Sequence, residues 1–396
     1  MIKAAILGYG VVGSGVYEII RKNAETIAEK TGGKAISVKY ILDLRDFPDH
    51  EQPELFTKNY DDILSDPEVS IVVEVMGGLN PAYDYSKAAL LAGKNVVTSN
   101  KELVAEHGTE LMEIAKDNDV NYLFEASVGG GIPIIRPLNQ CLAANKVEEI
   151  YGILNGTTNY ILTKMITEGA SFADALSEAQ RLGYAERNPE ADVEGYDACR
   201  KIAILASLAS GKYVSWRNVE TEGITKISKS DVAFADKYNS VIKLIGMAKI
   251  GDDGIDIRVS PMVISREHQL AGVDGVFNAI MVKGDCVGDV MFYGRGAGKL
   301  PTASAVVGDV IDAAKHLNIN KVTIWKGTNE DIVKDPENSV CRYFVRTNDA
   351  AVIDSFPGAE SLGNENGEWF FVTQEMAQSK FKEALADRGA FIRVLA

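Results

Sequence analysis

The sequence predicts an α/β protein that begins with a doubly wound parallel sheet, and three observations predict it. Through about residue 126, short apolar segments of strand length alternate with longer segments of helical period, the pattern of a parallel sheet with helices on both faces. A glycine-rich turn joins the first strand segment to the first helical one. Beyond residue 130 the order of strands and helices becomes mixed, which predicts a second, α+β domain with an open sheet and a small α+β C-terminal segment.

The first strand covers 2–7, and the turn Gly8-Tyr9-Gly10-Val11-Val12-Gly13 follows it directly. Apolar residues recur at helical intervals from Val12 to Ile27, so the turn stands between a strand and a helix. This is the context that the G-x-G-x-x-G fingerprint of a Rossmann-like dinucleotide-binding domain requires. A packing turn that holds no ligand is the alternative.

Each glycine of the fingerprint has a physical reason. Gly8 makes the tight turn, Gly10 lets the backbone approach a pyrophosphate, and Gly13 lets the helix pack on the strand. The pyrophosphate would lie at the helix N-terminus, where free N–H groups and the helix dipole favour anions. Val11 and Val12 at that terminus therefore join the glycines as predicted cofactor contacts.

The second strand, at 37–42, leads into Asp43, which bears on the choice of cofactor. Asp43 follows Gly13 by about 30 residues, later than the usual ~20, because the helix is longer and a glycine loop follows it. A carboxylate here bonds a ribose 2′-OH and favours NAD. Arg45, two residues on, would instead meet the 2′-phosphate of NADP, so both cofactors remain open.

The alternation continues to the end of the predicted sheet. Strands are expected at 70–76, 95–98 and 121–126, and helices at 81–91 and 102–116. Ligands bind beyond the carboxyl ends of such strands, where Gly77-Gly78 and the segment Thr98-Ser99-Asn100-Lys101 fall. Ser99 and Lys101 are predicted site residues on this ground, although a solvated lysine is the alternative for Lys101.

A glycine-dense turn from Ser127 to Pro133 is the predicted domain boundary, and Glu125 precedes it. A carboxylate beside exposed backbone carbonyls can hold a hard cation through oxygen ligands. On composition alone, a simple hinge is the plainer interpretation. The predicted domains are 1–130 with about 296–325 returning to it, 131–295, and 338–396.

The second domain is predicted from less regular signals. A strand at 150–154 leads into the polar turn Asn155-Gly156-Thr157-Thr158-Asn159, which is typical of a helix cap. A glycine-rich turn around Gly298 opens a helix that returns the chain toward the cofactor. The other expected elements are helices from Tyr160, at 174–182 and at 196–210, strands at 256–262 and 278–283, and in the tail strands at 342–346, 369–372 and 391–395 with a helix at 374–387.

Asp197 and Lys201 are the strongest candidates for active-site residues in this domain. Four residues apart, they lie on one face of a helix. An exposed ion pair is the usual interpretation of such a spacing. Here, however, the same helical row continues into Ile204 and Leu208, and the helix is apolar nearly all round. A carboxylate and an ammonium at the mouth of a buried helix are costly unless they are paired or used.

Composition excludes some classes of partner. The chain has 396 residues and a formal net charge of −15, which argues against nucleic acid and anionic membrane surfaces. Its four cysteines are widely spaced, without a zinc pattern, which suggests reduced thiols and a cytoplasmic location. The apolar start is too short and glycine-broken for a signal peptide or membrane span.

Six segments together strongly resemble homoserine dehydrogenases over roughly residues 1–320. They are Gly8-x-Gly10-x-x-Gly13, Thr98-Ser-Asn-Lys101, Glu125-Ala-Ser-Val-Gly-Gly-Gly-Ile-Pro133, Asn155-Gly-Thr-Thr-Asn-Tyr160, the run Gly183–Lys201, and Gly296-Ala-Gly-x-x-Pro-Thr-Ala-Ser304. Any one could occur by chance, but all six in order are highly specific. The resemblance implies NAD(P)-dependent interconversion of L-aspartate 4-semialdehyde and L-homoserine, with a small-molecule substrate.

The resemblance also implies roles for individual residues. Lys201 is implied as the general acid toward the aldehyde oxygen, and Lys101 as a second lysine beside substrate and nicotinamide. Asp197 and Glu186 would hold the amino end of the substrate. The remaining implied contacts are Gly156 and Thr157 for the substrate and Ser99, Gly183, Glu186 and Gly298 for the cofactor.

A structural sodium ion and an assembly are implied as well. The sodium site would combine Glu125 with the carbonyl groups of Val128, Gly130 and Ile132. The assembly would be a homodimer paired through the central sheet, or a homotetramer built from it. The tail has Ser355-Phe356-Pro357-Gly358 where the family's ACT module opens with Asp-x-Pro-Gly, so a reduced ACT-like unit is expected and threonine feedback is doubtful.

Two further hypotheses compete with this one. A related dehydrogenase for another small oxo acid would keep the dinucleotide domain but lack Glu186, Asp197 and Lys201 together. A non-catalytic sensor of NAD(P) would bind cofactor without turnover and tolerate loss of Lys201. The presence of the whole polar set at 186–201 favours the enzyme. Leu42 stands where relatives often carry a basic residue, which weakens the case for NADP.

Overall fold

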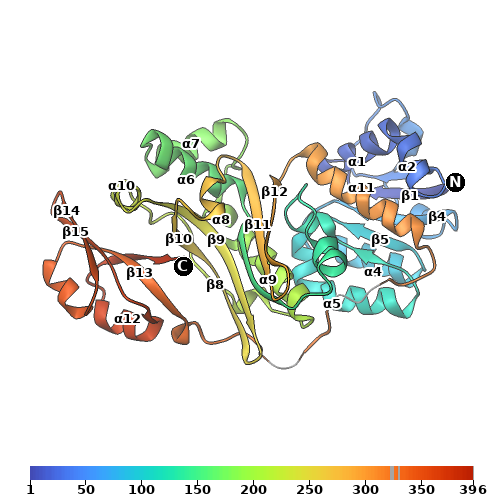
Figure 1. The fold of residues 1–396 in the computed structure, drawn as a ribbon. Coiled ribbons are helices and arrows are strands. Elements are labelled where there is room, and N and C mark those ends of the chain that lie inside the picture. The colour runs from blue at the N-terminus through green and yellow to red at the C-terminus, as the bar shows by residue number, and fades with distance from the viewer. Residues whose placement is uncertain (322–324, 329–330, 396) are drawn as a thin grey trace. The chain divides into compact units, whose positions relative to one another are not determined.

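The computed structural model describes residues 1–321, 325–328 and 331–395, and they form two compact units (Figure 1). Unit 1 comprises Met1–Ala144, Ser207–Ser215 and Gly294–Asn329, and unit 2 comprises Asn145–Ala206, Trp216–Tyr293 and Glu330–Ala396. Each unit has its own sheet and its own apolar core. No helix of the described residues is long and apolar enough to cross a bilayer.

Unit 1 contains the predicted parallel sheet, with six strands in the order β3-β2-β1-β4-β5-β6. The strands are β1 (Ile2–Leu7), β2 (Ile36–Leu42), β3 (Phe56–Thr57), β4 (Val69–Glu74), β5 (Asn95–Thr98) and β6 (Tyr122–Leu123). All five pairings are parallel. The strand order reverses between β1 and β4, and in doubly wound sheets the ligand crevice opens at that point. The Rossmann-like fold class is confirmed.

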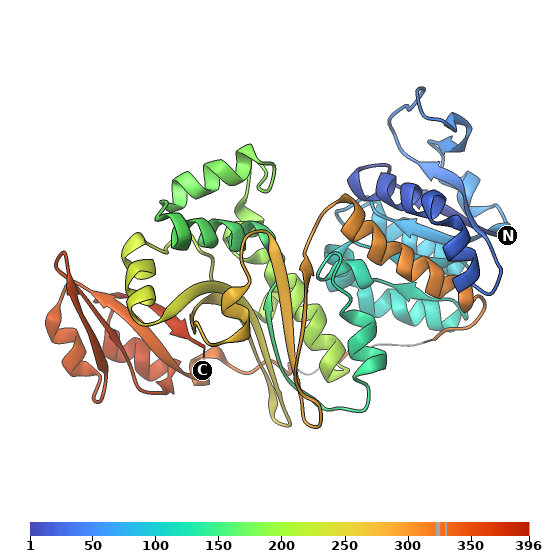
Figure 2. The same ribbon diagram turned by 45° about the horizontal axis from the view of Figure 1, so that its top comes forward.

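Helices cover both faces of this sheet (Figure 1). They are α1 (Val11–Lys22), α2 (Ala24–Lys30), α3 (Asp61–Leu64), α4 (Ala82–Leu91), α5 (Lys101–Asp117) and α11 (Lys299–Lys315). Figure 2 shows α11 side by side with α1, although 288 residues separate their starts at Val11 and Lys299. A Cβ on Gly15 would lie 2.8 Å from the Lys299 carbonyl oxygen, so glycine at this position is what lets the two helices approach.

Unit 2 is built on an 11-stranded sheet whose main path is β12-β11-β7-β9-β10-β17-β13-β15-β14. The strands are β7 (Val147–Ile153), β9 (Ser240–Gly251), β10 (Gly254–Ser265), β11 (Phe277–Gly284), β12 (Gly288–Arg295), β13 (Val340–Thr347), β14 (Glu360–Glu365), β15 (Glu368–Val372) and β17 (Ala390–Val394). The short strands β8 (Glu220–Thr221) and β16 (Met376–Ala377) pair off this path, with β10 and β13.

The helices of this unit are α6 (Gly156–Glu168), α7 (Phe172–Arg181), α8 (Glu190–Val193), α9 (Tyr196–Ser210), α10 (Lys229–Lys237) and α12 (Gln378–Leu385). Glycines at two strand positions leave room for helix α9 and for the Leu154 side chain. A Cβ on Gly246 would be 3.2 Å from Ile202 of α9 and 2.8 Å from the Leu154 side chain. A Cβ on Gly152 would be 2.6 Å from the same leucine side chain.

Several sequence-based element bounds were wrong. The strand predicted at 121–126 is only Tyr122–Leu123, because the chain turns into a 3-10 helix at Glu125–Ser127. The helix predicted from Tyr160 already begins at Gly156, directly after its cap. Strand β9 was not predicted at all, because most of its residues are apolar and buried on both faces, so it shows no alternation.

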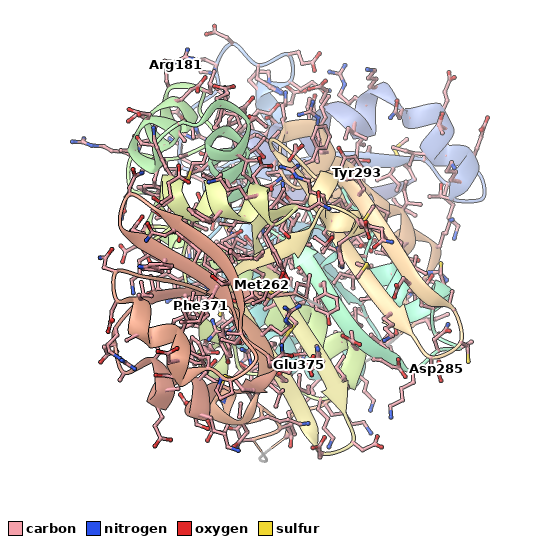
Figure 3. All side chains as sticks on the ribbon, turned by 60° about the vertical axis from the view of Figure 1, so that its left-hand side comes forward. Arg181, Met262, Asp285, Tyr293, Phe371 and Glu375 are labelled. Carbon is pink, nitrogen blue, oxygen red and sulfur yellow. The ribbon has the colours of Figure 1, made fainter. Side chains whose placement is uncertain are left out.

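The tail belongs to the same sheet as the rest of unit 2. Strand β17 lies between β10 and β13, parallel to the first and antiparallel to the second. Figure 3 shows this region with Phe371 of β15, which packs in a tail core with Tyr343 and Phe381.

The junction between tail and sheet carries a buried arginine, Arg393 of β17. Its side chain is 2% exposed. The guanidinium donates to Glu222 at 2.9 Å and to the Gln378 side-chain oxygen at 2.7 Å, and lies 3.2 Å from Glu220. Because these partners come from β8, the segment after it and α12, the arginine joins the tail to the rest of unit 2.

We predict that Arg393→Met lowers the stability of unit 2 by about 3 kcal/mol, because it leaves buried acceptors without their cation. Thermal unfolding followed by circular dichroism measures the shift. The matched control is Lys382→Met, which breaks the half-exposed pair with Glu337 and should cost less than about 1 kcal/mol. Equal melting temperatures for the two variants would contradict the prediction.

Candidate active site

The glycine-rich turn has the geometry expected of a pyrophosphate cradle. Gly8 has φ +94°, and its N–H donates to the Leu42 carbonyl at 2.8 Å. A Cβ on Gly13 would lie 1.9 Å from the Gly8 carbonyl oxygen, whereas one on Gly10 would meet nothing within 4 Å. Gly10 therefore faces open space.

The start of α1 offers unused donors. The first intrahelical bond runs from Ser14 N to Gly10 O at 3.0 Å. The N–H groups of Val11, Val12 and Gly13 thus have no partner within the helix, as at any helix N-terminus. Together with the dipole of a 12-residue helix, they suit an anionic phosphate.

Asp43, at the end of β2, is held by its neighbours. Its carboxylate accepts the Tyr9 N–H at 2.8 Å and three bonds from Arg45, two of them from the guanidinium at 2.9 Å. The Arg45 guanidinium holds the pKa of this carboxyl well below its usual range. Arg45 itself is exposed. The end of β2 therefore carries both a cation, the Arg45 guanidinium, and an anion, the Asp43 carboxylate.

The carboxyl ends of β4 and β5 are tied together by Glu74, which sequence analysis did not identify. Its buried carboxylate accepts the Thr98 hydroxyl at 2.6 Å and the Met76 N–H at 2.8 Å. Burial raises the pKa of this carboxyl, against the effect of its hydrogen bonds. The Asn100 side chain reaches back to the Gly78 carbonyl at 2.6 Å and caps α5. These contacts fix the segment that carries Ser99 and Lys101.

Lys101 is the first residue of α5, and Ser99 lies directly before its cap. Both are half-buried at the carboxyl edge of the sheet. The structure therefore places both predicted residues where ligands of doubly wound sheets bind.

Glu125 is almost fully buried and is surrounded by donors. Its two oxygens accept the N–H groups of Ile134 (2.6 Å), Ile135 (2.8 Å) and Arg136 (2.9 Å). The Arg136 side chain lies 3.2 Å from Glu125 and 3.1 Å from Asp309. Burial raises the pKa of Asp309 to about 8, opposed by that arginine. The carbonyl groups of Val128, Gly130 and Ile132 accept no hydrogen bond from the described residues.

In unit 2, Asp197 and Lys201 form the predicted pair. The ammonium donates to Asp197 Oδ2 at 2.7 Å and to the Leu154 carbonyl at 2.7 Å. Their side chains are 9% and 11% exposed. The pair is therefore a nearly buried one, and the interpretation as a solvated surface pair is wrong.

Asn155 completes this cluster and was missed as a site residue. Its side-chain oxygen caps α6 by accepting the Thr158 N–H at 2.8 Å, as the polar turn predicts. Its side-chain nitrogen donates to Asp197 at 2.9 Å and to Asp192 at 2.7 Å. Two carboxylates, those of Asp192 and Asp197, thus meet at one amide, and one of them also accepts from the Lys201 ammonium.

The first turn of α6 lies next to this cluster in the chain. Asn155 accepts the first two helical bonds, from Thr158 N to its side chain and from Asn159 N to its carbonyl. The N–H groups of Gly156 and Thr157 have no partner among the described residues. The Thr157 hydroxyl donates to the Tyr184 carbonyl at 2.6 Å, which fastens the segment after α7 to this turn.

The other predicted residues lie on exposed turns. Gly183 has φ +77° and follows α7, and Glu186 is exposed three residues later in the same unit. No described hydrogen bond joins the Glu186 carboxylate to Asp197 or Lys201. Gly298, in unit 1, has φ +131° and is the N-cap of α11.

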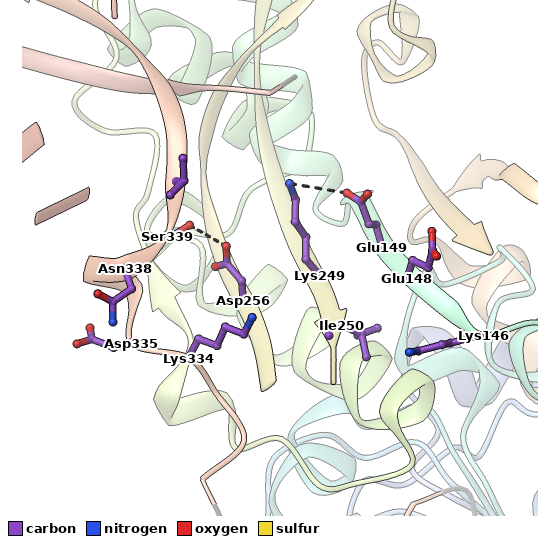
Figure 4. Close-up of a pocket in the computed structure, with 12 residues that line it drawn as sticks. Lys146, Glu148, Glu149, Lys249, Ile250, Asp256, Lys334, Asp335, Asn338 and Ser339 are labelled. Atoms are coloured by element: carbon purple, nitrogen blue, oxygen red, sulfur yellow. Dashed lines mark hydrogen bonds and ion pairs between the residues drawn. The ribbon is translucent and has the colours of Figure 1, made fainter. Parts of the chain in front are cut away.

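A pocket of about 460 Å³ in unit 2 contains none of the predicted site residues (Figure 4). Lys249 faces Glu149 across it at 3.8 Å, and Ser339 donates to Asp256 at 2.7 Å. Charges of both signs therefore already pair within it. Its lining is Lys146, Glu148, Glu149, Lys249, Ile250, Gly251, Asp256, Lys334, Asp335, Asn338, Ser339 and Val340.

Comparisons with known proteins point in one direction. A family model described as homoserine dehydrogenase matches residues 133–311, and one described as its NAD-binding domain matches residues 8–125. The homoserine dehydrogenase of Synechocystis is 46% identical over 85% of this chain and 76% of its own length.

Solved structures agree. A homoserine dehydrogenase from Thiobacillus denitrificans has a TM-score of 0.89 at 35% identity, covering 100% of this chain and 98% of its own. A hyperthermophilic archaeal homoserine dehydrogenase mutant in complex with NADPH has a TM-score of 0.67 at 30% identity, covering 79% of this chain and 97% of its own.

Two glycine substitutions test the pyrophosphate cradle separately from the fold. Gly13→Ala should unfold the turn, because its methyl group would overlap the Gly8 carbonyl. Gly10→Ala should leave the melting temperature unchanged but weaken dinucleotide binding at least about tenfold, because the methyl group occupies the space of the pyrophosphate. Fluorescence titration with NADPH and NADH measures the affinity. Unchanged affinity in a folded Gly10→Ala variant would exclude this placement.

Proposed function

The chain belongs to the homoserine dehydrogenase family, and from this premise we propose which of its residues carry the reaction. It is an NAD(P)-dependent oxidoreductase that acts on a CH–OH group. The reaction is the reversible reduction of L-aspartate 4-semialdehyde to L-homoserine, in the pathway to threonine, methionine and isoleucine. When bound, the nicotinamide supplies or accepts the hydride, and the protein must supply the proton and the binding contacts.

Lys201 is the proposed general acid. Reduction turns the aldehyde oxygen into an alkoxide, which requires a cation and a proton nearby. Of the three N–H bonds of the ammonium, Asp197 and the Leu154 carbonyl take two. The third is used by no described hydrogen bond, and we assign it to the substrate oxygen. In the oxidation of homoserine, the same nitrogen receives the hydroxyl proton.

The amino-acid end of the substrate has two proposed anchors. Its ammonium group would lie at the carboxylates of Asp197 and Glu186, and the meeting of two carboxylates at the Asn155 amide supports this. Its carboxylate would rest on the N–H groups of Gly156 and Thr157, at the N-terminus of the 13-residue helix α6. The same contacts would reject aldehydes without an amino-acid end.

The proposed cofactor contacts follow the sheet edge and two glycine turns. The pyrophosphate would bind at Gly8, Gly10 and Gly13 and at the N–H groups of Val11 and Val12. Ser99 and Lys101 would lie by the nicotinamide end, with Lys101 a second cation toward the substrate. Gly183, Glu186 and Gly298 are the remaining proposed cofactor contacts.

The choice between NAD and NADP would be made at Asp43 and Arg45. An NADPH complex exists for the archaeal relative. In this chain, the Arg45 guanidinium lies on Asp43, so it neutralises the carboxylate that would repel a 2′-phosphate. We therefore propose that the enzyme uses both cofactors, with Arg45 supporting NADP and Asp43 supporting NAD.

A sodium ion is a further proposed ligand, and the residues fit it in part. The unused carbonyl oxygens of Val128, Gly130 and Ile132 are suitable hard ligands. The Glu125 carboxylate fits less well as a direct ligand, because its oxygens already accept three backbone N–H groups. It would contribute mainly its charge.

The proposed assembly is a homodimer formed through the sheet of unit 2. The edge strand β12 supports it, because two of its large apolar residues are exposed: Met291 to 41%, and Tyr293, which Figure 3 labels, to 54%. Large apolar side chains that are exposed to solvent often mark a protein–protein interface. A cytoplasmic location is proposed on the four free cysteines, and the tail at 338–396 is proposed to act as a reduced ACT-like unit.

Replacement of Lys201 tests the assignment of the acid. We expect Lys201→Met to lower kcat for homoserine oxidation by about 10²–10⁴-fold, the usual contribution of a general acid or base, with unchanged NADP affinity. Lys201→Arg should be similarly slow, because arginine keeps its proton. The control is the exposed Lys229→Met on α10 of the same unit, which should keep wild-type turnover. A kcat of Lys201→Met within threefold of the wild-type value would contradict the assignment of Lys201 as the general acid.

Two substitutions test cofactor selection. Arg45→Ala should reduce kcat/KM with NADP by about tenfold or more while leaving NAD unaffected, because one charge-assisted contact to the phosphate is lost. Asp43→Asn should reduce kcat/KM with NAD by weakening the bond to the ribose. Initial rates with both cofactors at fixed homoserine measure the ratio. Parallel losses with the two cofactors would show that this strand end does not discriminate between them.

A further inference from the structure

Asn278 is a buried amide without a partner. The residue is 0% exposed, and neither its side-chain oxygen nor its side-chain nitrogen has a hydrogen-bond partner among the described residues. It is the one Asn or Gln side chain of the described residues in this state. Because an unpaired buried polar group costs free energy, native proteins pair nearly all of them. An unpaired buried amide next to a proposed substrate site therefore calls for a functional explanation.

Asn278 lies beneath the first turn of α6. It is the second residue of β11, and its neighbours Ala279 and Met281 face the apolar cluster on one side of the sheet, so its own side chain points to the other side. A Cβ built on Gly156 would lie 3.6 Å from the Asn278 side-chain oxygen. The amide therefore stands directly behind the turn that we assign to the substrate carboxylate.

The segment before Asn278 is locked onto α6 and leaves the amide little freedom. The Asn159 side-chain nitrogen faces the carbonyl groups of Val273, Gly275 and Phe277 at 3.0–3.1 Å. The fully buried Lys243 ammonium donates to Val273 O at 2.7 Å and to Asp274 at 2.8 Å. The Val276 carbonyl oxygen would be 2.9 Å from a Cβ on Gly156. The loop at residues 273–277 is thus held in place and lies in close contact with Gly156.

We propose that Asn278 is a substrate-positioning residue that acts through Gly156. The substrate carboxylate accepts hydrogen bonds from the N–H groups of Gly156 and Thr157. Its binding moves the first turn of α6 toward the Asn278 amide, and the turn and the amide then form a hydrogen bond. In the free enzyme, the unpaired amide is unfavourable in free energy. Binding of the amino acid gives the amide a partner and removes this penalty. This inference rests on the proposed carboxylate site at α6.

Asn278→Leu separates this role from a purely structural one, because leucine has nearly the same shape and no polar atoms. Removing an amide that has no partner in the free enzyme should keep or raise its melting temperature. The same change should raise the KM for homoserine about tenfold, with kcat within threefold and NADP affinity unchanged. Asn278→Ala provides a second, smaller variant, and Asn364→Leu, an exposed amide on β14, is the matched control.

The outcomes differ for each alternative. A higher melting temperature with unchanged KM would show that the amide has no role, and a lower one with unchanged KM would show a structural partner such as a buried water; either overturns the proposal. The inhibition constants of 4-hydroxybutyrate, which keeps the carboxylate, and 3-aminopropan-1-ol, which lacks it, test the carboxylate site itself. Asn278→Leu should weaken only the former. If 4-hydroxybutyrate does not inhibit the wild type, the assignment of the carboxylate to α6 fails, whatever Asn278 does.

Discussion

The pairing of one nearly buried ammonium group, that of Lys201, constrains much of unit 2. A lysine that is 11% exposed requires acceptors within reach, and it finds them in Asp197 one helical turn back and in the Leu154 carbonyl after β7. The sheet carries glycine at 246, which leaves room for Ile202 of α9, and glycine at 152, which leaves room for the Leu154 side chain. Helix, strand end and glycines therefore form one arrangement that fixes the position of the Lys201 ammonium group.

Asn155 connects this arrangement to the helix that would hold the substrate. One end of its amide caps α6 and the other binds Asp192 and Asp197. The start of α6 and the Asp197 carboxylate beside Lys201 are thus positioned by a single side chain. In unit 1, Glu74 fixes the loops at the strand ends by the same kind of double contact.

Local signals in the sequence predicted what depends on local spacing. The glycine fingerprint, the parallel sheet and the Asp197–Lys201 pair were recognisable because their partners lie a few residues apart or repeat with a period. Asn155 escaped as a site residue because Asp197 is 42 residues away, and Glu74 because Thr98 is 24 residues away. Strand β9 escaped because a strand buried on both faces has no alternation to detect. The strand order of the large sheet is likewise set by pairings that no short segment encodes.

The position of β17 has a consequence for how the chain assembles. Although it is the last strand in sequence, it lies in the interior of the sheet, between β10 and β13. During synthesis, the strands before it emerge first and form two separate blocks, each with an open edge. These blocks can join only when Ala390–Val394 has left the ribosome, so their open edges need protection until then.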